Sequence, residues 1–245
     1  SPYDAVFHVA GIAHSDNGKI SPEKEKLYYS VNTELTSAAA GKAKSDGVHQ
    51  FIFMSSAIVY GNSAPIGKTK IITADTPVSP ANCYGDSKVQ AEKRLKLFED
   101  ENFKVVILRP PMIYGKGSKG NYPLLAKLAL KLPLFPRVRN ERSMLYIENL
   151  CEFVRLMIEN EESGTFFPQN SEYSNTSELV KMIADAHGKK IKLVSGFTWL
   201  LKIMSHFTAL VNKAFGNLTY EKSISEYKEN YRVAELGDSV KRTEG

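Results

Sequence analysis

The stretch Gln50-Phe51-Ile52-Phe53-Met54-Ser55-Ser56 begins as an apolar run and ends in two serines. A short apolar run bounded by a turn signal, here Val59-Tyr60-Gly61, is typical of a buried strand. Tyr84 and Lys88 lie four residues apart, so on a helix both side chains would extend from one face. We therefore expect serine at the carboxyl end of a strand to face tyrosine and lysine on a nearby helix.

This arrangement of side chains can make a base at neutral pH. The Lys88 ammonium, together with a cationic cofactor ring, would favour the phenolate of Tyr84 and lower its pKa from a value near 10. The serine hydroxyl would hydrogen-bond the substrate oxygen while a hydride leaves the carbon. The pair alone is weak evidence, because a tyrosine packed at a helix start and a solvated lysine give the same spacing.

Further strands and helices alternate along the first half of the chain. Residues 5–11 are a short apolar run ending in small residues, and residues 104–108 form a third strand that Arg109-Pro110-Pro111 ends. Helices are expected over Glu25–Ser45 and Cys83–Asn102. This alternation predicts an α/β fold with a parallel, doubly wound sheet.

Composition and charge exclude several classes of protein. The 245 residues carry a net charge of +5 without a Lys/Arg run of the kind that binds nucleic acid. Cys83 and Cys151 form neither a disulfide framework nor a metal site, and His8 has no partner at metal spacing, so we expect no metal. The start of the chain has no signal-peptide pattern, and we expect a reducing, cytoplasmic location.

The most apolar late stretch, Phe197–Phe215, is interrupted by Lys202, His206, Asn212 and Lys213. These polar residues argue against stable insertion across a membrane. We expect a helix that covers an apolar surface, with contact to a membrane or a partner as the open alternative.

Six blocks of sequence, taken in order, resemble one family. They are Val6–Gly11, Val31–Thr36, Phe53–Gly61, Tyr84–Lys88, Leu108–Gly115 and Arg142–Leu150. Together they are similar to the extended short-chain dehydrogenase/reductases, in the NAD-dependent nucleotide-sugar epimerase/dehydratase branch. That branch includes the UDP-glucose and UDP-GlcNAc 4-epimerases and the UDP-N-acetylhexosamine C4 oxidoreductases. The resemblance implies a Rossmann-like sheet with a smaller, mostly helical substrate domain.

The resemblance also implies roles for individual residues. Tyr84 would be the catalytic base, Lys88 would hold the nicotinamide ribose, and Ser56 would complete the triad and contact the substrate. The cofactor would be NAD, with NADP left open. Its binding residues would be Ala10, Gly11, Asn32, Ser55, Tyr84, Lys88, Pro110 and Pro111.

Three further positions are substrate-binding candidates by the same resemblance. Arg142 matches an arginine that binds the diphosphate, a role suited to a permanently charged bidentate group, although a surface salt bridge is the alternative. Asn121 is a further candidate for contact with the substrate. Met112 stands where many 4-epimerases have a substrate-binding asparagine, which leans towards the oxidoreductase members.

Two departures from the family pattern limit these expectations. No Gly-x-x-Gly-x-x-Gly turn follows a strand, although the family opens with one to hold the pyrophosphate. We expect the sequence to be a fragment lacking this module; the alternative is a protein without it. Ala57 and Ile58 follow Ser56 where sugar 4,6-dehydratases have Asp-Glu, so dehydratase activity is not expected.

The sequence therefore predicts an NAD(P)-dependent epimerase acting at C4 of a UDP-hexose or UDP-N-acetylhexosamine in surface polysaccharide synthesis. A 4-dehydrogenase or 4-keto reductase, and a non-catalytic fragment or scaffold, are the alternatives. Residues 1–115 would form the partial dinucleotide domain, with 143–168 packing on it. Residues 116–142 and 169–245 would form the substrate region. Relatives often pair through two helices per subunit, so a homodimer is expected through residues 25–45 and 83–102.

Overall fold

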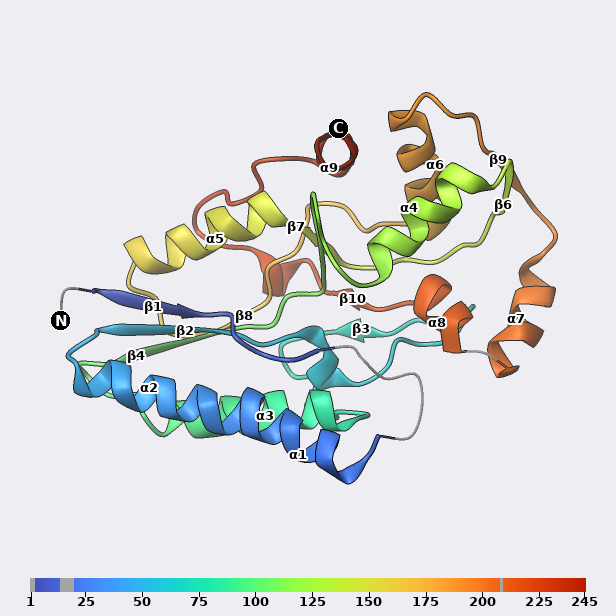
Figure 1. Cartoon of the computed structure of the whole chain (residues 1–245). Coiled ribbons are helices and arrows are strands. Elements are labelled where there is room, and N and C mark those ends of the chain that lie inside the picture. The colour runs from blue at the N-terminus through green and yellow to red at the C-terminus, as the bar shows by residue number, and fades with distance from the viewer. Residues whose placement is uncertain (1–2, 14–19, 208) are drawn as a thin grey trace. The chain divides into compact units, whose positions relative to one another are not determined.

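The sheet of the first unit of the chain has four parallel strands (Figure 1). Their order is β1 (Ala5–His8), β2 (Gln50–Met54), β4 (Lys104–Leu108) and β8 (Gly164–Phe166). The computed structural model describes residues 3–13, 20–207 and 209–245. This unit comprises Ser1–Asn62, Asp75–Pro111 and Phe153–Pro168. The three strands expected in the first half of the chain are confirmed.

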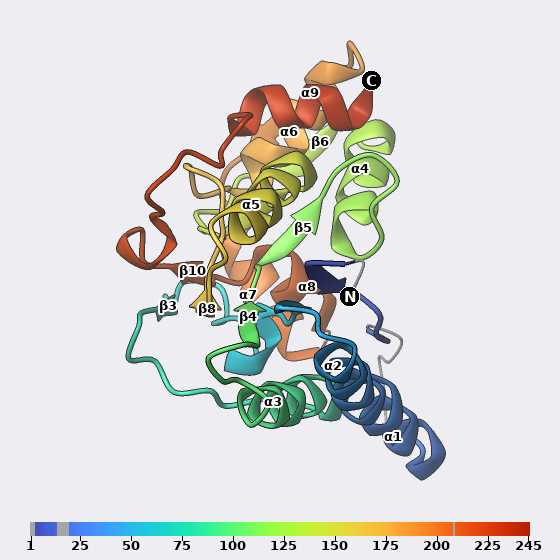
Figure 2. The ribbon, with the colours of Figure 1, turned by 90° about the vertical axis from the view of Figure 1, so that its left-hand side faces the viewer.

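Helices cover one face of this sheet. α2 (Thr36–Ser45) and α3 (Cys83–Lys96) run side by side along it (Figures 1 and 2). Side chains alternate along a strand, so Phe51, Phe53, Val105 and Ile107 all point to the helices, where they form a core with Ala40, Ala91 and Leu95. This apolar face fixes the register of β2 against β4.

The opposite face of the sheet is also covered. Ile52, Val106 and Leu108 are fully buried there. The part of α5 (Ile147–Glu159) that belongs to this unit starts at Phe153, whose ring meets that of Phe166 edge-on at 5.9 Å. Helices on both faces of a parallel sheet define the doubly wound architecture, and the expected fold class is confirmed.

Two helix boundaries differ from the expectation. The first helical region begins at α1 (Pro22–Tyr29), where Ser21 caps the amino end, and reaches α2 through a π-helical turn, Ser30–Leu35. The second, α3, ends at Lys96 rather than Asn102, because the chain turns back there and Asp100 pairs with Phe103.

The second unit comprises Ser63–Ala74, Met112–Glu152 and Gln169–Gly245. Its strands form three parallel pairs. These are β5 (Met112–Tyr114) with β7 (Met144–Tyr146), β6 (Leu134–Pro136) with β9 (Lys192–Val194), and β3 (Ile71–Ile72) with β10 (Thr219–Tyr220). Its helices are α4 (Asn121–Lys131), the first part of α5, α6 (Thr176–Ala186), α7 (Thr198–Phe207), α8 (Ala209–Phe215) and α9 (Leu236–Glu244).

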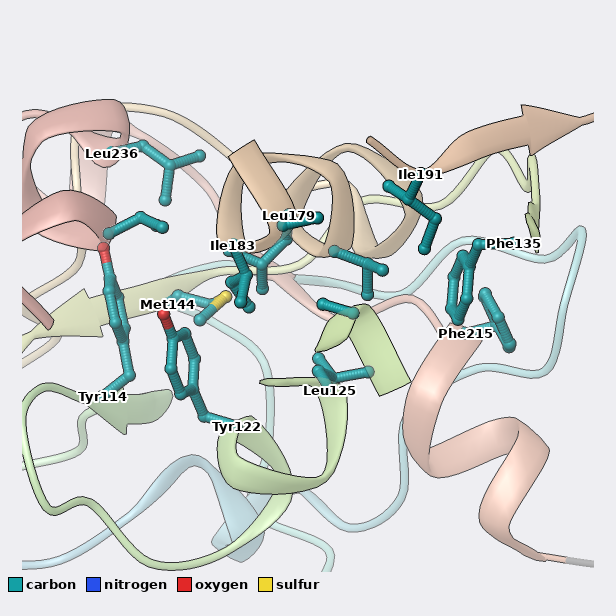
Figure 3. Close-up of a cluster of buried hydrophobic side chains, with 14 of the residues drawn as sticks. Tyr114, Tyr122, Leu125, Phe135, Met144, Leu179, Ile183, Ile191, Phe215 and Leu236 are labelled. Carbon is teal, nitrogen blue, oxygen red and sulfur yellow. The ribbon is translucent and has the colours of Figure 1, made fainter. Parts of the chain in front are cut away.

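The core of the second unit gathers around α6, which packs against α4 and α9 (Figure 3). Leu179 and Ile183 of α6 are buried next to Leu125 of α4. The rings of Tyr114 and Tyr122 stack at 5.3 Å between centroids. This unit therefore has its own apolar core.

The division between units differs from the expected boundary at residue 115. Residues 63–74 belong to the second unit, because β3 pairs with β10. Residues 112–115 also belong to it, because β5 pairs with β7. Residues 143–152, expected beside the dinucleotide domain, lie in the second unit as well.

Candidate functional site

The carboxyl ends of β1, β2 and β4 meet at one edge of the parallel sheet. Ser55 and Ser56 follow β2 and Pro110 follows β4, while the segment after β1 leads to Gly11. Backbone hydrogen bonds hold the ends together: Ser55 N donates to Leu108 O at 2.8 Å and Ala57 N to Pro110 O at 2.9 Å. Ligands of open α/β sheets bind at this edge.

Ser56 and Tyr84 share a side-chain hydrogen bond. Ser56 caps a 3-10 helix, Ala57–Tyr60, and its hydroxyl accepts from Ile58 N at 3.3 Å. Tyr84 lies in the first turn of α3, which approaches this 3-10 helix closely at Gly85. A Cβ at Gly85 would lie 2.9 Å from Ile58 O, so the close approach requires glycine.

Lys88 lies one turn beyond Tyr84 on α3 and is almost completely buried, with 5% of its surface exposed. Its Nζ donates to Met54 O at 2.9 Å and lies 4.6 Å from the centre of the Phe53 ring. Burial lowers the pKa of Lys88 to about 8, and the nearby Glu92 carboxylate opposes that shift. The amine is therefore easy to deprotonate.

The pKa of Tyr84 moves in the opposite direction to the sequence expectation. Burial raises the pKa of Tyr84, the Ser56 hydrogen bond lowers it, and the neighbouring Tyr28 raises it, with a net increase. The expected decrease is thus wrong for the chain alone, because loss of water disfavours a phenolate more than its neighbours favour it.

Asn32 connects the segment after β1 to α3. It lies in the π-helical turn and is fully buried. Its Nδ2 donates to Ile12 O and to Ser87 Oγ, each at 3.0 Å, and its Oδ1 accepts from Ile12 N at 2.8 Å. Single π turns are frequent at functional sites, and here the turn directs an amide towards the sheet edge.

Gly11 lies next to Asn32 and Lys88. A Cβ at Gly11 would lie 3.1 Å from Asn32 Oδ1 and 3.2 Å from Lys88 Nζ. Ala10 and Gly11 are exposed, so backbone beside the amine is accessible. A site that leaves little room for a Cβ, at the carboxyl edge of a parallel sheet, fits the close backbone approach that a dinucleotide needs.

A buried ion pair that sequence reasoning missed lies behind the serines. Arg109 donates to the Glu92 carboxylate through Nε at 3.1 Å and Nη2 at 2.6 Å, and Nη1 donates to Tyr60 Oη at 2.7 Å. Ser55 Oγ donates to Glu92 Oε1 at 2.5 Å. The sequence held one sign that Glu92 is buried. Glu92 follows Lys88 by one turn, on the face of α3 that also carries the buried Leu95.

The substrate candidates Met112, Asn121 and Arg142 belong to the second unit. Met112 begins β5 and Asn121 begins α4, and both are half-buried. Arg142 Nη1 donates to Ala214 O at 3.2 Å, and burial lowers the pKa of Arg142 to about 10.

The part of the chain that the structure describes has neither a cluster of metal-binding side chains nor a membrane-spanning helix. No group of three or more His, Cys, Asp or Glu residues there could hold a metal ion. Among the same residues, no helix is both long and apolar enough to span a bilayer.

A family model described as the NAD dependent epimerase/dehydratase family matches residues 1–167. The chain belongs to this family. The resemblance drawn from the six sequence blocks is thereby confirmed, and the family consists of NAD-dependent enzymes that include the UDP-glucose 4-epimerases.

Two curated relatives are similar over most of this chain. A UDP-glucose 4-epimerase of Vibrio cholerae is 34% identical over 217 residues, which are 86% of this chain and 63% of that protein. An N-acetyl-α-D-glucosaminyl-diphospho-undecaprenol 4-epimerase of Escherichia coli O157:H7 is 31% identical over 77% of this chain and 56% of that protein. The chain thus spans less than two thirds of either relative.

Solved structures show the same fold. A UDP-glucuronic acid 4-epimerase of Bacillus cereus, in complex with NAD, has a TM-score of 0.72 at 18% identity, covering 97% of this chain and 72% of that one. A dTDP-4-dehydrorhamnose reductase of Clostridium acetobutylicum has a TM-score of 0.73 at 17% identity, covering 98% and 79%.

Proposed function

We propose that the chain carries the catalytic residues of an NAD-dependent epimerase acting at C4 of a UDP-sugar, with Ser56, Tyr84 and Lys88 as the triad. The observation that supports this most is the Ser56–Tyr84 hydrogen bond beside a buried Lys88, at the carboxyl edge of a parallel sheet. If Tyr84 only packed at the start of α3, Lys88 one turn away would be expected in solvent. Lys88 is instead buried with a lowered pKa, which is typical of functional sites.

In this proposal the side chains divide the work of proton transfer. Tyr84 Oη takes the proton of the C4 hydroxyl, and Ser56 Oγ hydrogen-bonds the same substrate oxygen. Lys88 places positive charge next to the site where the phenolate forms and hydrogen-bonds the ribose of the dinucleotide. The bound NAD would accept hydride from C4 and return it to the other face of the keto sugar.

The proposed cofactor contacts follow from the geometry of the sheet edge. Ala10 and Gly11 offer exposed backbone beside Lys88, and Pro110 and Pro111 end β4 at the same edge. Asn32 and Ser55 are buried and hydrogen-bonded to the protein, so we assign them to ordering the site rather than to direct contact. NADP is the alternative cofactor.

For the substrate, we propose that Arg142 binds the diphosphate and that Met112 and Asn121 contact the sugar or its carrier. A guanidinium interacts strongly with phosphate, and burial has already removed part of the water around Arg142. The name of the Vibrio cholerae relative favours UDP-glucose as the substrate. The name of the Escherichia coli relative favours a polyprenyl-diphosphate sugar as the second candidate, and the exposed apolar face of α7 is compatible with one.

Two other assignments accompany this proposal. Cys83 and Cys151 are not joined in a disulfide, which supports a cytoplasmic location, where surface polysaccharide precursors would be processed. Exposed Leu27 and Leu35 on the first helical region support a homodimer through that region and α3.

Product analysis with UDP-glucose and UDP-GlcNAc, with and without added NADH, tests the proposal. An epimerase yields the C4 epimer without net oxidation, whereas a 4-keto reductase or 4-dehydrogenase changes the cofactor stoichiometrically. Tyr84→Phe should lower kcat by about 10²–10⁴-fold. Tyr29→Phe is a matched control, since it removes a neighbouring phenol that hydrogen-bonds Asp86. Equal activity of Tyr84→Phe and wild type would refute the triad, and no turnover of any of these sugars would favour the non-catalytic alternative.

A further inference from the structure

The outer face of α7 is apolar and exposed. Trp199 is 64% exposed and Ile203 49%, and Leu200 and Met204 are exposed beside them. Positions i, i+1, i+4 and i+5 share one face of a helix, so these side chains form a continuous strip. Leu201 points the other way and packs against the core of the second unit. One face of α7 thus packs on the core of the second unit, and the opposite, apolar face is exposed.

Lysines flank this apolar strip. A Cβ on Gly67 would lie 3.3 Å from both Cε and Nζ of Lys202, so the Lys202 side chain lies against the loop before β3. The next residue of that loop, Lys68, is exposed, and Lys70 follows two positions later. Two segments distant in sequence therefore place lysines at the same side of α7.

The two sequence intervals that contain α7 and the loop before β3 carry lysines and no acidic residue. No aspartate or glutamate occurs between Asp185 and Glu221, an interval with five lysines. None occurs between Asp46 and Asp75 either, the interval that holds Lys68 and Lys70. An apolar strip flanked by lysines complements a membrane surface, which has an apolar interior beneath anionic headgroups.

We propose that α7 binds the surface of membranes that contain anionic phospholipids. The helix has ten residues and is about 15 Å long, so it lies in the interface plane rather than crossing it. Trp199 and Ile203 enter the boundary between headgroups and acyl chains, and Lys202 and Lys68 contact lipid phosphates. The contact does not depend on the catalytic residues proposed above.

The charges favour a membrane over a second copy of the chain. A symmetric contact through α7 would place the same patch on both partners. Lys202 and Lys68 of one copy would then lie close to the lysines of the other, without an acidic residue from either interval to compensate them. An anionic lipid surface meets the apolar strip and the lysines together.

Trp199 is the only tryptophan of the chain and reports directly on this contact. Vesicles of phosphatidylcholine mixed with phosphatidylglycerol should shift its emission to shorter wavelength and sediment with the protein. Each basic residue near an anionic leaflet contributes about fivefold in affinity, so Lys68→Glu with Lys202→Glu should weaken binding at least ~25-fold. Ile203→Ser with Met204→Ser keeps the tryptophan and should remove the shift.

Matched controls distinguish this contact from general loss of apolar surface or charge. Val233→Ser removes an exposed apolar side chain elsewhere in the same unit, and Lys228→Glu reverses an exposed lysine there. Both should bind vesicles like wild type. Unchanged Trp199 emission with mixed vesicles, or equal binding by the α7 variants, would overturn the proposal. Self-association without vesicles that the α7 variants abolish would assign the face to a second copy and also overturn it.

Discussion

Replacing Lys88 by methionine should stabilise the chain at pH 7 while it abolishes the proposed activity. Burial lowers the pKa of the amine from 10.5 to about 8, so the folded chain holds a charge at pH 7 at a penalty of about 3 kcal/mol. The hydrogen bond to Met54 O and the Phe53 ring beneath the ammonium offset about 1–2 kcal/mol of that penalty. Methionine removes the charge penalty together with these two interactions. The free energy of unfolding of Lys88→Met at pH 7 should therefore exceed that of the wild type by about 1.5 kcal/mol.

The pH dependence of this gain identifies its cause. A lysine whose pKa is lowered by folding destabilises the folded state fully below pH 8. The penalty disappears as the pH rises towards 10.5, because the folded state has then already released the proton. The advantage of Lys88→Met should therefore shrink between pH 7 and pH 9.5 and reverse at higher pH, where only the lost hydrogen bond counts.

Urea unfolding of the wild type and Lys88→Met at several pH values between 7 and 10 measures the difference in their free energies of unfolding. Other titrating groups are common to both proteins, so their contributions cancel in this difference. At pH 7 the melting temperature of the variant should be about 3–6 °C higher for a chain of this length. Lys93→Met, which replaces an exposed lysine of the same helix, is the matched control for loss of a positive charge from α3. A difference that stays constant with pH, or a variant less stable at pH 7 than at pH 9.5 relative to wild type, would refute the argument.

Three further predictions test the groups that surround the triad. Arg109→Met should lower the free energy of unfolding, measured with urea, by about 3–5 kcal/mol, because it leaves the buried Glu92 carboxylate uncompensated. The double variant with Glu92→Gln should recover more than half of that loss. Strictly additive effects of the two substitutions would contradict the pairing. Asn32→Ala should cost about 1–3 kcal/mol and speed amide exchange at Ile12, whose N–H loses its acceptor; unchanged exchange would argue against that link. Gly61→Ala should lower stability by more than ~1 kcal/mol, because φ is 81° and the new Cβ would lie 2.6 Å from a backbone carbonyl oxygen; a neutral effect would refute that strain.

Sequence alone could predict the groups that lie at the edge of the sheet. The run ending in Ser55-Ser56 and the Tyr84–Lys88 spacing each specify local structure. The rule that parallel strands end at a common edge then brings the serines and the helix together. In the structure β2 is a central strand, and Ser56 shares a hydrogen bond with Tyr84; their catalytic roles stay a prediction.

Sequence could not predict contacts that depend on which elements become neighbours. The Glu92–Arg109 pair exists because β4 lies beside β2, and no local pattern specifies that pairing. The assignment of residues 63–74 depends on β10, far along the chain. The π-helical turn has no residue signature that separates it from the α-helices on either side. The stretch after Phe197 was expected to cover an apolar surface, yet much of α7 faces outward.

The sign of the Tyr84 pKa shift shows why spacing is not enough to specify chemistry. Spacing places a lysine near a tyrosine, but burial acts on both groups and favours the uncharged form of each. In the chain alone the Tyr84 phenol is therefore a weaker acid than usual, and the Lys88 ammonium is a stronger acid than usual. Additional positive charge beside Tyr84 would favour the phenolate and lower its pKa, as the proposed cationic nicotinamide ring would do. We accordingly expect Tyr84 to titrate at lower pH with the oxidised cofactor bound than without it, and ultraviolet difference spectra of wild type against Tyr84→Phe would detect that change.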